Sequence, residues 1–349
     1  RTLNDRLDGL GLHQSSGTSA FHSNFSGSLV ADNLEAALEL YGEILQRPML
    51  LADQFELCRE LAIQTLDSLE DDPHQKISML VREQYLPYPV GRPALGKRVE
   101  LQELQAGEVK EYYRRCYGAE GTILAAAGKV DWKRLKEAVE RIFGKWKAGQ
   151  VSAAAAGKCQ SRYYHENNQG AQVHIGLIYP SVDYRHPDYY KALAAANVLS
   201  GGMGSRLFTE VREKRGLCYS VSAGHQVTGE YGMVQCYLGS TPERAQEGLD
   251  VMAGELRKLG EGITQDELDR AKVGLRASLI MQGESSGARA MACARDYYQL
   301  GRVRSLDEID QAIQKLTVEE VLEHVRQYPP KDFAAATIGP KELKIHLSY

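Results

Sequence analysis

One stretch of the chain reads Leu199-Ser-Gly-Gly-Met-Gly-Ser-Arg-Leu-Phe-Thr-Glu-Val-Arg-Glu-Lys-Arg-Gly-Leu-Cys-Tyr219. Its pattern predicts a glycine-rich turn, a short helix and the start of a strand. We expect Ser205 to cap the helix, because a serine hydroxyl can accept a hydrogen bond from a backbone N–H of the first turn. Gly216 favours the left-handed conformation that ends a helix. The stretch therefore places Arg212 on the helix and Tyr219 at the strand that follows.

This segment resembles the signature of the second domain of the pitrilysin/insulinase-like zinc peptidases, the inverzincins. In that family, the half that lacks the metal supplies a glycine turn, an arginine and, seven positions later, a tyrosine. The resemblance implies that Gly201, Gly202, Arg212 and Tyr219 bind substrate and support the transition state at a zinc ion held elsewhere. Without the resemblance, the same residues are a helix-to-strand corner with a solvated arginine and a packed tyrosine.

The composition is that of a soluble globular protein, with 43% hydrophobic and 25% charged residues. Its 349 residues suffice for two domains of ordinary size. The net charge of -4, without a long run of lysine or arginine, gives no reason to expect a nucleic-acid partner. No apolar run approaches the roughly 20 residues that span a bilayer, so we expect no membrane span. The six scattered cysteines fit free thiols better than a disulfide scaffold.

The chain is predicted to consist of two similar halves. Each half contains a strand, a helix, a long helix and then a closing helix and strand. In the first half we expect them at residues 25–30, 33–45, 52–69, 106–117 and 122–128, and in the second at residues 232–238, 242–256, 264–282, 317–327 and 333–338. The order predicts the α+β class, with each domain an antiparallel-rich sheet covered by helices on one face. This agrees with the duplicated, metallohydrolase-like fold that the resemblance implies.

The predicted domains are residues 1–147 and 163–349, joined by a linker over residues 148–162 that is rich in alanine and glycine. The second half also has a strand and a helix, at residues 172–178 and 188–199, before its glycine turn. The first half has no counterpart, because residue 1 already lies in the next expected helix. The resemblance implies that the first domain as written lacks its first strand and its metal-bearing helix.

A zinc peptidase needs about three protein ligands and a carboxylate to activate the bound water. The inverzincins supply two histidines and a glutamate as H-x-x-E-H, a motif absent from the nine histidines of this chain. Their third ligand is a glutamate on the long helix. Counting back from Pro73 in the acidic turn Glu70-Asp-Asp-Pro73, this position falls on Gln64 or Thr65, neither of which is anionic. We therefore expect this chain to bind no metal or other cofactor, and zinc to be held by a partner.

The leading hypothesis is a non-catalytic subunit or half of a zinc-dependent peptidase, because bacterial relatives of this size often work as pairs. The partner would be a family member bearing H-x-x-E-H, in a homo- or heterodimer that acts on a peptide substrate. Such a chain is inactive alone and belongs to a zinc metalloendopeptidase only with its partner. One alternative is an active peptidase whose H-x-x-E-H segment is not in this chain. Another is a purely structural family member. Both a cytoplasmic and a periplasmic location are compatible with the sequence.

Overall fold

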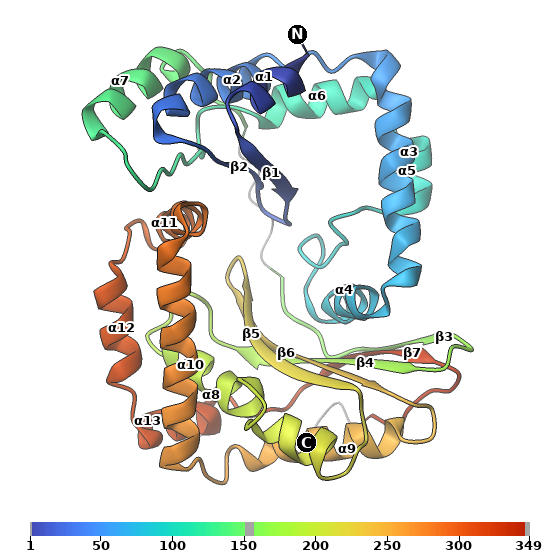
Figure 1. Ribbon diagram of the computed structural model, residues 1–349. Coiled ribbons are helices and arrows are strands. Elements are labelled where there is room, and N and C mark those ends of the chain that lie inside the picture. Colours follow the sequence, from blue (N-terminus) through green and yellow to red (C-terminus); the bar gives the residue numbers. More distant parts are fainter. Residues whose placement is uncertain (1, 151–156, 346–349) are drawn as a thin grey trace. The chain divides into compact units, whose positions relative to one another are not determined.

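Contacts within the chain divide it into two units. Unit 1 comprises residues 1–66, 94–155 and 282–304, and unit 2 comprises residues 67–93, 156–281 and 305–349. The computed structural model describes residues 2–150 and 157–345. Both units combine helices with antiparallel strand pairs (Figure 1), so the predicted α+β class is confirmed. The predicted linker lies partly outside the described residues.

The centre of unit 2 is a five-stranded sheet in the order β3-β7-β4-β6-β5. Its strands are β3 (Tyr163–Asn167), β4 (Val173–Ser181), β5 (Ser220–Thr228), β6 (Tyr231–Ser240) and β7 (Ala334–Gly339). All neighbours pair antiparallel except β3 and β7, which are parallel. The first seven residues of the central strand β4 are all buried. β5 is an edge strand, which leaves its outer backbone groups unpaired by any described strand.

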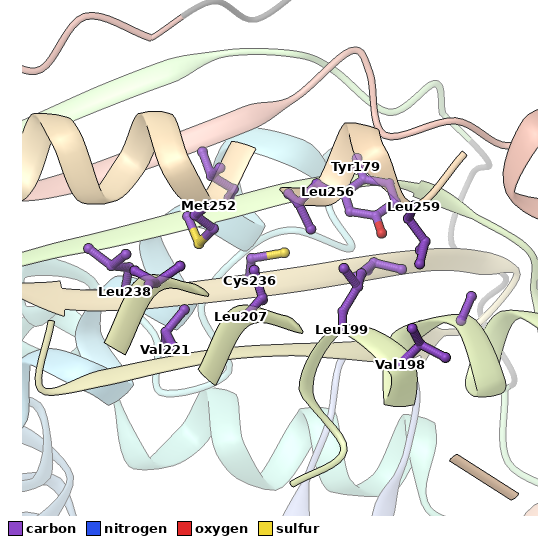
Figure 2. Packing of buried hydrophobic residues seen from close by; sticks show 14 of the residues in the cluster. Tyr179, Val198, Leu199, Leu207, Val221, Cys236, Leu238, Met252, Leu256 and Leu259 are labelled. Atoms are coloured by element: carbon purple, nitrogen blue, oxygen red, sulfur yellow. The ribbon is translucent and has the colours of Figure 1, made fainter. Parts of the chain in front are cut away.

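One face of this sheet carries the larger hydrophobic core of unit 2 (Figure 2). Alternate residues of the strands point to it, as Ile175, Leu177, Cys236 and Leu238 do, because side chains along a strand alternate between faces. The helices whose buried residues join them are α8 (Tyr189–Ser200), α9 (Ala245–Lys258), α10 (Gln265–Glu284) and α13 (Val318–Gln327), together with the π-helical segment η3 (Phe208–Glu213). The short helix α12 (Leu306–Gln314) also belongs to this unit.

The opposite face of the sheet is covered by one helix, α4 (Pro73–Tyr85), which follows the turn η2 (Leu69–Asp71). Its residues Ile77 and Val81 are fully buried against side chains of β4, β6 and β7. The Asp72 side chain caps the helix by accepting from the Gln75 N–H at 3.0 Å. A segment from the first half of the sequence thus completes the core of the sheet that the second half builds.

Unit 1 is mainly helical. Its hairpin, β1 (His13–Thr18) and β2 (Ser23–Ser28), packs with a small core that includes Leu7 and Leu40. Its other elements are α1 (Leu3–Gly9), η1 (Ala31–Asn33), α2 (Leu34–Gln46), α3 (Ala52–Ser68), α5 (Arg98–Glu103), α6 (Ala106–Cys116), α7 (Trp132–Phe143) and α11 (Ser286–Leu300). α3 continues into unit 2 at residue 67, and α10 of unit 2 continues into unit 1 at residue 282.

Two local predictions are wrong. Residues 122–128 do not form a strand. In the second half, the corresponding strand β7 pairs with β3 on one side and with β4 on the other. No described strand of unit 1 pairs with residues 122–128 on either side. The Ser205 hydroxyl does not cap the short helix, because it has no hydrogen-bond partner and is buried among the described residues. The helix begins instead with the backbone bond from the Thr209 N–H to the Ser205 carbonyl, at 3.0 Å.

Candidate functional site

The candidate site is the corner between α8 and β5 in unit 2, residues 200–219. It contains the glycine turn, the short helical segment that includes η3, and the loop into β5. Four leucine and valine side chains anchor it in the larger core: Leu199, Leu207, Val211 and Leu217 are all at most 4% exposed. Two of these side chains, Leu207 and Val211, come from the short helical segment and fix it to the sheet.

An ion pair attaches the start of this segment to α10. The Arg206 guanidinium donates to both carboxylate oxygens of Glu267, at 2.6 and 2.8 Å, and to the Gly262 carbonyl at 2.7 Å. Glu267 also forms a capping box with Thr264 at the start of α10, because its backbone N–H donates to the Thr264 hydroxyl and its carboxylate accepts from the Thr264 N–H. Its hydrogen bond with Arg206 is the main reason why the pKa of Glu267 falls to about 2.

The two predicted glycines differ in what they contribute. The Gly201 N–H donates to the Asn197 carbonyl at 2.6 Å, and a Cβ atom at Gly201 would lie 2.6 Å from that oxygen. Gly201 is therefore needed for the tight exit from α8. A Cβ atom at Gly202 would meet nothing within 4 Å, so the fold itself leaves that position open.

Arg212 projects from η3 with its guanidinium exposed. Its Cζ atom lies 5.0 Å from the centre of the Phe208 ring, a cation–π geometry. The neighbouring cations behave differently, because Lys214 and Arg215 both pair with the Glu210 carboxylate at 2.6 Å. Within the part of the chain that the structure describes, no carboxylate forms an ion pair with Arg212. Its fork of donors is thus held in place by an aromatic ring and remains available to an external acceptor.

Tyr219 has a fixed backbone and a free side chain. Its N–H donates to the Gly239 carbonyl at 3.0 Å, while 71% of the residue is exposed. The preceding carbonyls are also held, that of Gly216 by Arg244 and that of Leu217 by the Ser240 hydroxyl. Gly216 has φ of 59°, in the left-handed region, as predicted. No described residue forms a hydrogen bond with the Tyr219 hydroxyl, so the expectation of a packed tyrosine is not met.

Similarity to known proteins agrees with this geometry. The family profile described as "Peptidase M16 inactive domain" matches residues 103–275. An uncharacterised zinc protease of Mycobacterium tuberculosis is 28% identical over 352 residues, covering 97% of this chain and 79% of the relative. The uncharacterised zinc protease YmxG of Bacillus subtilis is 24% identical over 343 residues, covering 97% of this chain and 84% of the relative. The chain is thus similar to the peptidase M16 family, whose relatives match it over nearly its whole length.

Solved structures share the fold of this chain. A peptidase M16 inactive domain from Pseudomonas fluorescens matches with a TM-score of 0.83 at 22% identity, covering 99% of this chain and 85% of that chain. A chain of Complex III2 from Candida albicans matches with a TM-score of 0.86 at 17% identity, covering 97% of this chain and 84% of that chain. At such identities the likeness concerns the fold. The resemblance to the zinc peptidase family that the sequence indicated is confirmed by the family profile and the relatives.

The position that the resemblance assigns to a third zinc ligand lies in unit 1. Gln64 and Thr65 are both exposed on α3, and the Thr65 hydroxyl donates to the Leu61 carbonyl at 2.9 Å. Neither side chain offers the imidazole, thiolate or carboxylate that zinc prefers. Among residues 2–150 and 157–345, no group of three or more His, Cys, Asp or Glu could hold a metal ion. The residues present do not fit a zinc site.

The sequence did not reveal a polar cluster beside the corner. The acidic turn before α4, used only to set the register of Gln64 and Thr65, lies in unit 2. The ring of His74, directly after this turn, packs against the ring of Tyr237, and the Tyr237 hydroxyl is within hydrogen-bond distance of His174 Nδ1. The contributing segments are far apart in the sequence, so only the pairing of β4 with β6 could have revealed the cluster.

None of the described helices is long and apolar enough to cross a membrane.

Proposed function

We propose that this chain is the non-catalytic subunit or half of a zinc-dependent peptidase. In this role it supplies Arg212 and Tyr219 to a zinc site on a partner that bears H-x-x-E-H. One observation carries the proposal: both side chains are exposed on a backbone that several hydrogen bonds and buried residues fix. A residue that only stabilised the corner would gain from burying its side chain, whereas a residue that acts on a bound molecule must present it to solvent.

The chemistry of the two residues suits a peptide substrate. A tyrosine hydroxyl can donate to the oxygen that becomes negative when a peptide carbonyl is attacked, an interaction strongest in the transition state. The arginine fork can hold a substrate carbonyl and fix the register of the peptide. β5 begins directly after Tyr219, and its outer edge is unpaired by any described strand. An extended peptide could add to this edge with its backbone near the tyrosine.

The test is a complex of this chain with an H-x-x-E-H family member from the same organism. Tyr219→Phe removes one donor and keeps the ring, so we expect a fall in turnover on the order of 100–1000-fold with unchanged thermal unfolding. Arg212→Ala should lower turnover as well, mainly because the substrate is then positioned less well. Lys214→Ala, on the same helical segment but paired with Glu210, is the matched control and should retain activity. Unchanged turnover in both test variants would show that the corner is structural.

Metal analysis separates the proposal from the alternative of a peptidase that is active by itself. We expect the purified chain to contain no stoichiometric zinc and to cleave no peptide, because Gln64 and Thr65 are neutral and the histidine pair is absent. One zinc per chain, lost on substitution of a residue in unit 1, would contradict the proposal. If the full complex has no peptidase activity, the result would favour the alternative of a purely structural family member. The fold shared with a chain of Complex III2 is the observation that supports this alternative.

A further inference from the structure

A buried histidine–tyrosine pair lies beside the Arg212/Tyr219 corner, on the face of the sheet that α4 covers. The Nδ1 atom of His174 on β4 is 2.9 Å from the hydroxyl of Tyr237 on β6. The two residues are only 7% and 8% exposed. Burying a polar pair of this kind beside the apolar cluster under α4 costs desolvation energy on folding. Its position next to a candidate functional residue gives it a use beyond stability.

Gly239 connects this pair to Tyr219. In the strand pairing, Gly239 lies opposite His174 on one side and opposite Ser220 on the other. Its carbonyl accepts the N–H of Tyr219. A Cβ atom at Gly239 would lie only 2.7 Å from the Tyr237 hydroxyl oxygen. The Tyr237 hydroxyl therefore occupies the space of the missing side chain, and any movement of this hydroxyl bears on the strand that holds Tyr219.

Three titratable groups act on the pair: His74, Asp72 and Cys218. The His74 ring from α4 lies 4.3 Å from the Tyr237 ring, between ring centres, in an edge-on arrangement. Burial lowers the pKa of His174, His74 lowers it further, and Asp72 opposes the shift. Burial also raises the pKa of Tyr237, an effect that Asp72 and Cys218 increase. Near neutral pH the pair is thus uncharged, and the tyrosine hydroxyl can donate to His174 Nδ1.

We propose that His174 and Tyr237 are positioning residues for Tyr219, acting through Gly239. This inference rests on the proposed function of Tyr219. Protonation of His174 places a proton on Nδ1, which must then donate, so the hydroxyl proton of Tyr237 has to turn away. The hydroxyl lies over Gly239, so this change in its hydrogen bonding occurs beside the residue whose carbonyl holds the Tyr219 N–H. The orientation of Tyr219 consequently responds to pH below the ordinary histidine pKa of about 6.5.

Fluorotyrosine incorporated at position 219 of the full chain tests this without a partner or a substrate. Fluorine NMR spectra recorded from about pH 4 to about pH 7.5 should show a resonance that moves with a midpoint below about 6.5. Tyr237→Phe, which keeps the ring and removes the hydroxyl, should abolish this movement, and so should His174→Gln. His165→Gln is the matched control. His165 Nδ1 is also 2.9 Å from a hydroxyl of the same sheet, that of Thr337, but His165 lies on β3, the edge strand opposite to β5.

Loss of the movement in both test variants, with the control unchanged, supports the proposal. A resonance that does not move in the wild-type chain, or that still moves in either test variant, overturns it. The turnover of the partner complex is a separate measurement. If the complex is inactive, the proposed function fails, whereas the fluorine spectra still decide whether the pair positions Tyr219. If the complex is active, Tyr237→Phe should also flatten the acidic side of its pH–rate profile.

Discussion

In unit 2, His225 is a partly buried imidazole and His324 a buried one, and folding lowers the pKa of both. The His225 Nε2 atom lies 2.9 Å from the Val182 carbonyl, and burial is the main reason why the pKa of His225 falls to about 4. His324 is 4% exposed, and its Nδ1 atom is 3.6 Å from the Asp188 carboxylate. Burial lowers the pKa of His324 too, although Asp188 opposes the shift. Both residues are neutral in the folded chain at pH 7.

These histidines predict that the chain loses stability on mild acidification. Below the ordinary histidine pKa of about 6.5, both histidines become protonated in the unfolded chain before they do so in the folded chain. The free energy of unfolding therefore decreases as the pH falls. For His225 the decrease continues to about pH 4, its pKa in the folded state. His225→Gln keeps a donor for the Val182 carbonyl and removes the titration, so its stability should depend less on pH over this range. Urea unfolding at several pH values measures the slopes, and equal slopes would contradict the assignment.

At the scale of elements, the N-terminus of α10 holds the candidate corner in place. The Thr264/Glu267 capping box could be predicted from the sequence, because both partners are three positions apart and their bonds are local. The ion pair between Arg206 and Glu267 could not be predicted, since it joins residues that are 61 positions apart. The Ser205 cap failed for a related reason: burial of Leu207 and Val211 fixes the segment, and the serine hydroxyl follows it into the interior. The π-helical hydrogen bonding of η3 also has no signal in the sequence.

Glu267→Gln should destabilise unit 2 by about 1–3 kcal/mol, because it replaces charge-assisted bonds to a mostly buried arginine side chain. The matched control is Glu320→Gln at α13, where Thr317 and Glu320 form a second capping box without an arginine clamp. It should cost no more than about 1 kcal/mol. The carboxylate contribution of Glu267 is complete above about pH 4.3 and is lost as the pH falls towards 2, its folded-state pKa. Denaturant unfolding of both variants at neutral and acidic pH checks both expectations.

At the scale of the whole molecule, the main elements of the second half could be predicted, but the unit to which each segment belongs could not. The helices and strands of the second half lie close to the predicted ranges, because their apolar residues follow helical or alternating periods. The boundary at residues 148–162 remains a prediction. The division by contacts places residues 67–93 with the second-half sheet and residues 282–304 with unit 1. Periodicity shows that a helix has an apolar face, but it does not show which sheet that face will cover.

The role of α4 makes the domain boundary testable. Ile77, Val81 and Tyr85 of α4 are at most 3% exposed, and each buried side chain of this size contributes about 1.5–3 kcal/mol. Together they provide on the order of 5 kcal/mol, comparable to the net stability of a whole domain. We therefore expect a fragment of residues 163–349 to unfold without a cooperative transition and to bind a hydrophobic dye, because the α4-covered face of its sheet is exposed.

Adding a peptide of residues 67–93 should restore cooperative thermal unfolding of this fragment and displace the dye. The same peptide carrying Ile77→Asp and Val81→Asp is the matched control and should do neither, since it would bury two unpaired carboxylates. Circular dichroism during heating and dye fluorescence measure the two effects. If the fragment of residues 163–349 unfolds cooperatively by itself, with the stability of the intact unit, then α4 only covers a domain that is already complete, and the boundary predicted from the sequence is the physical one.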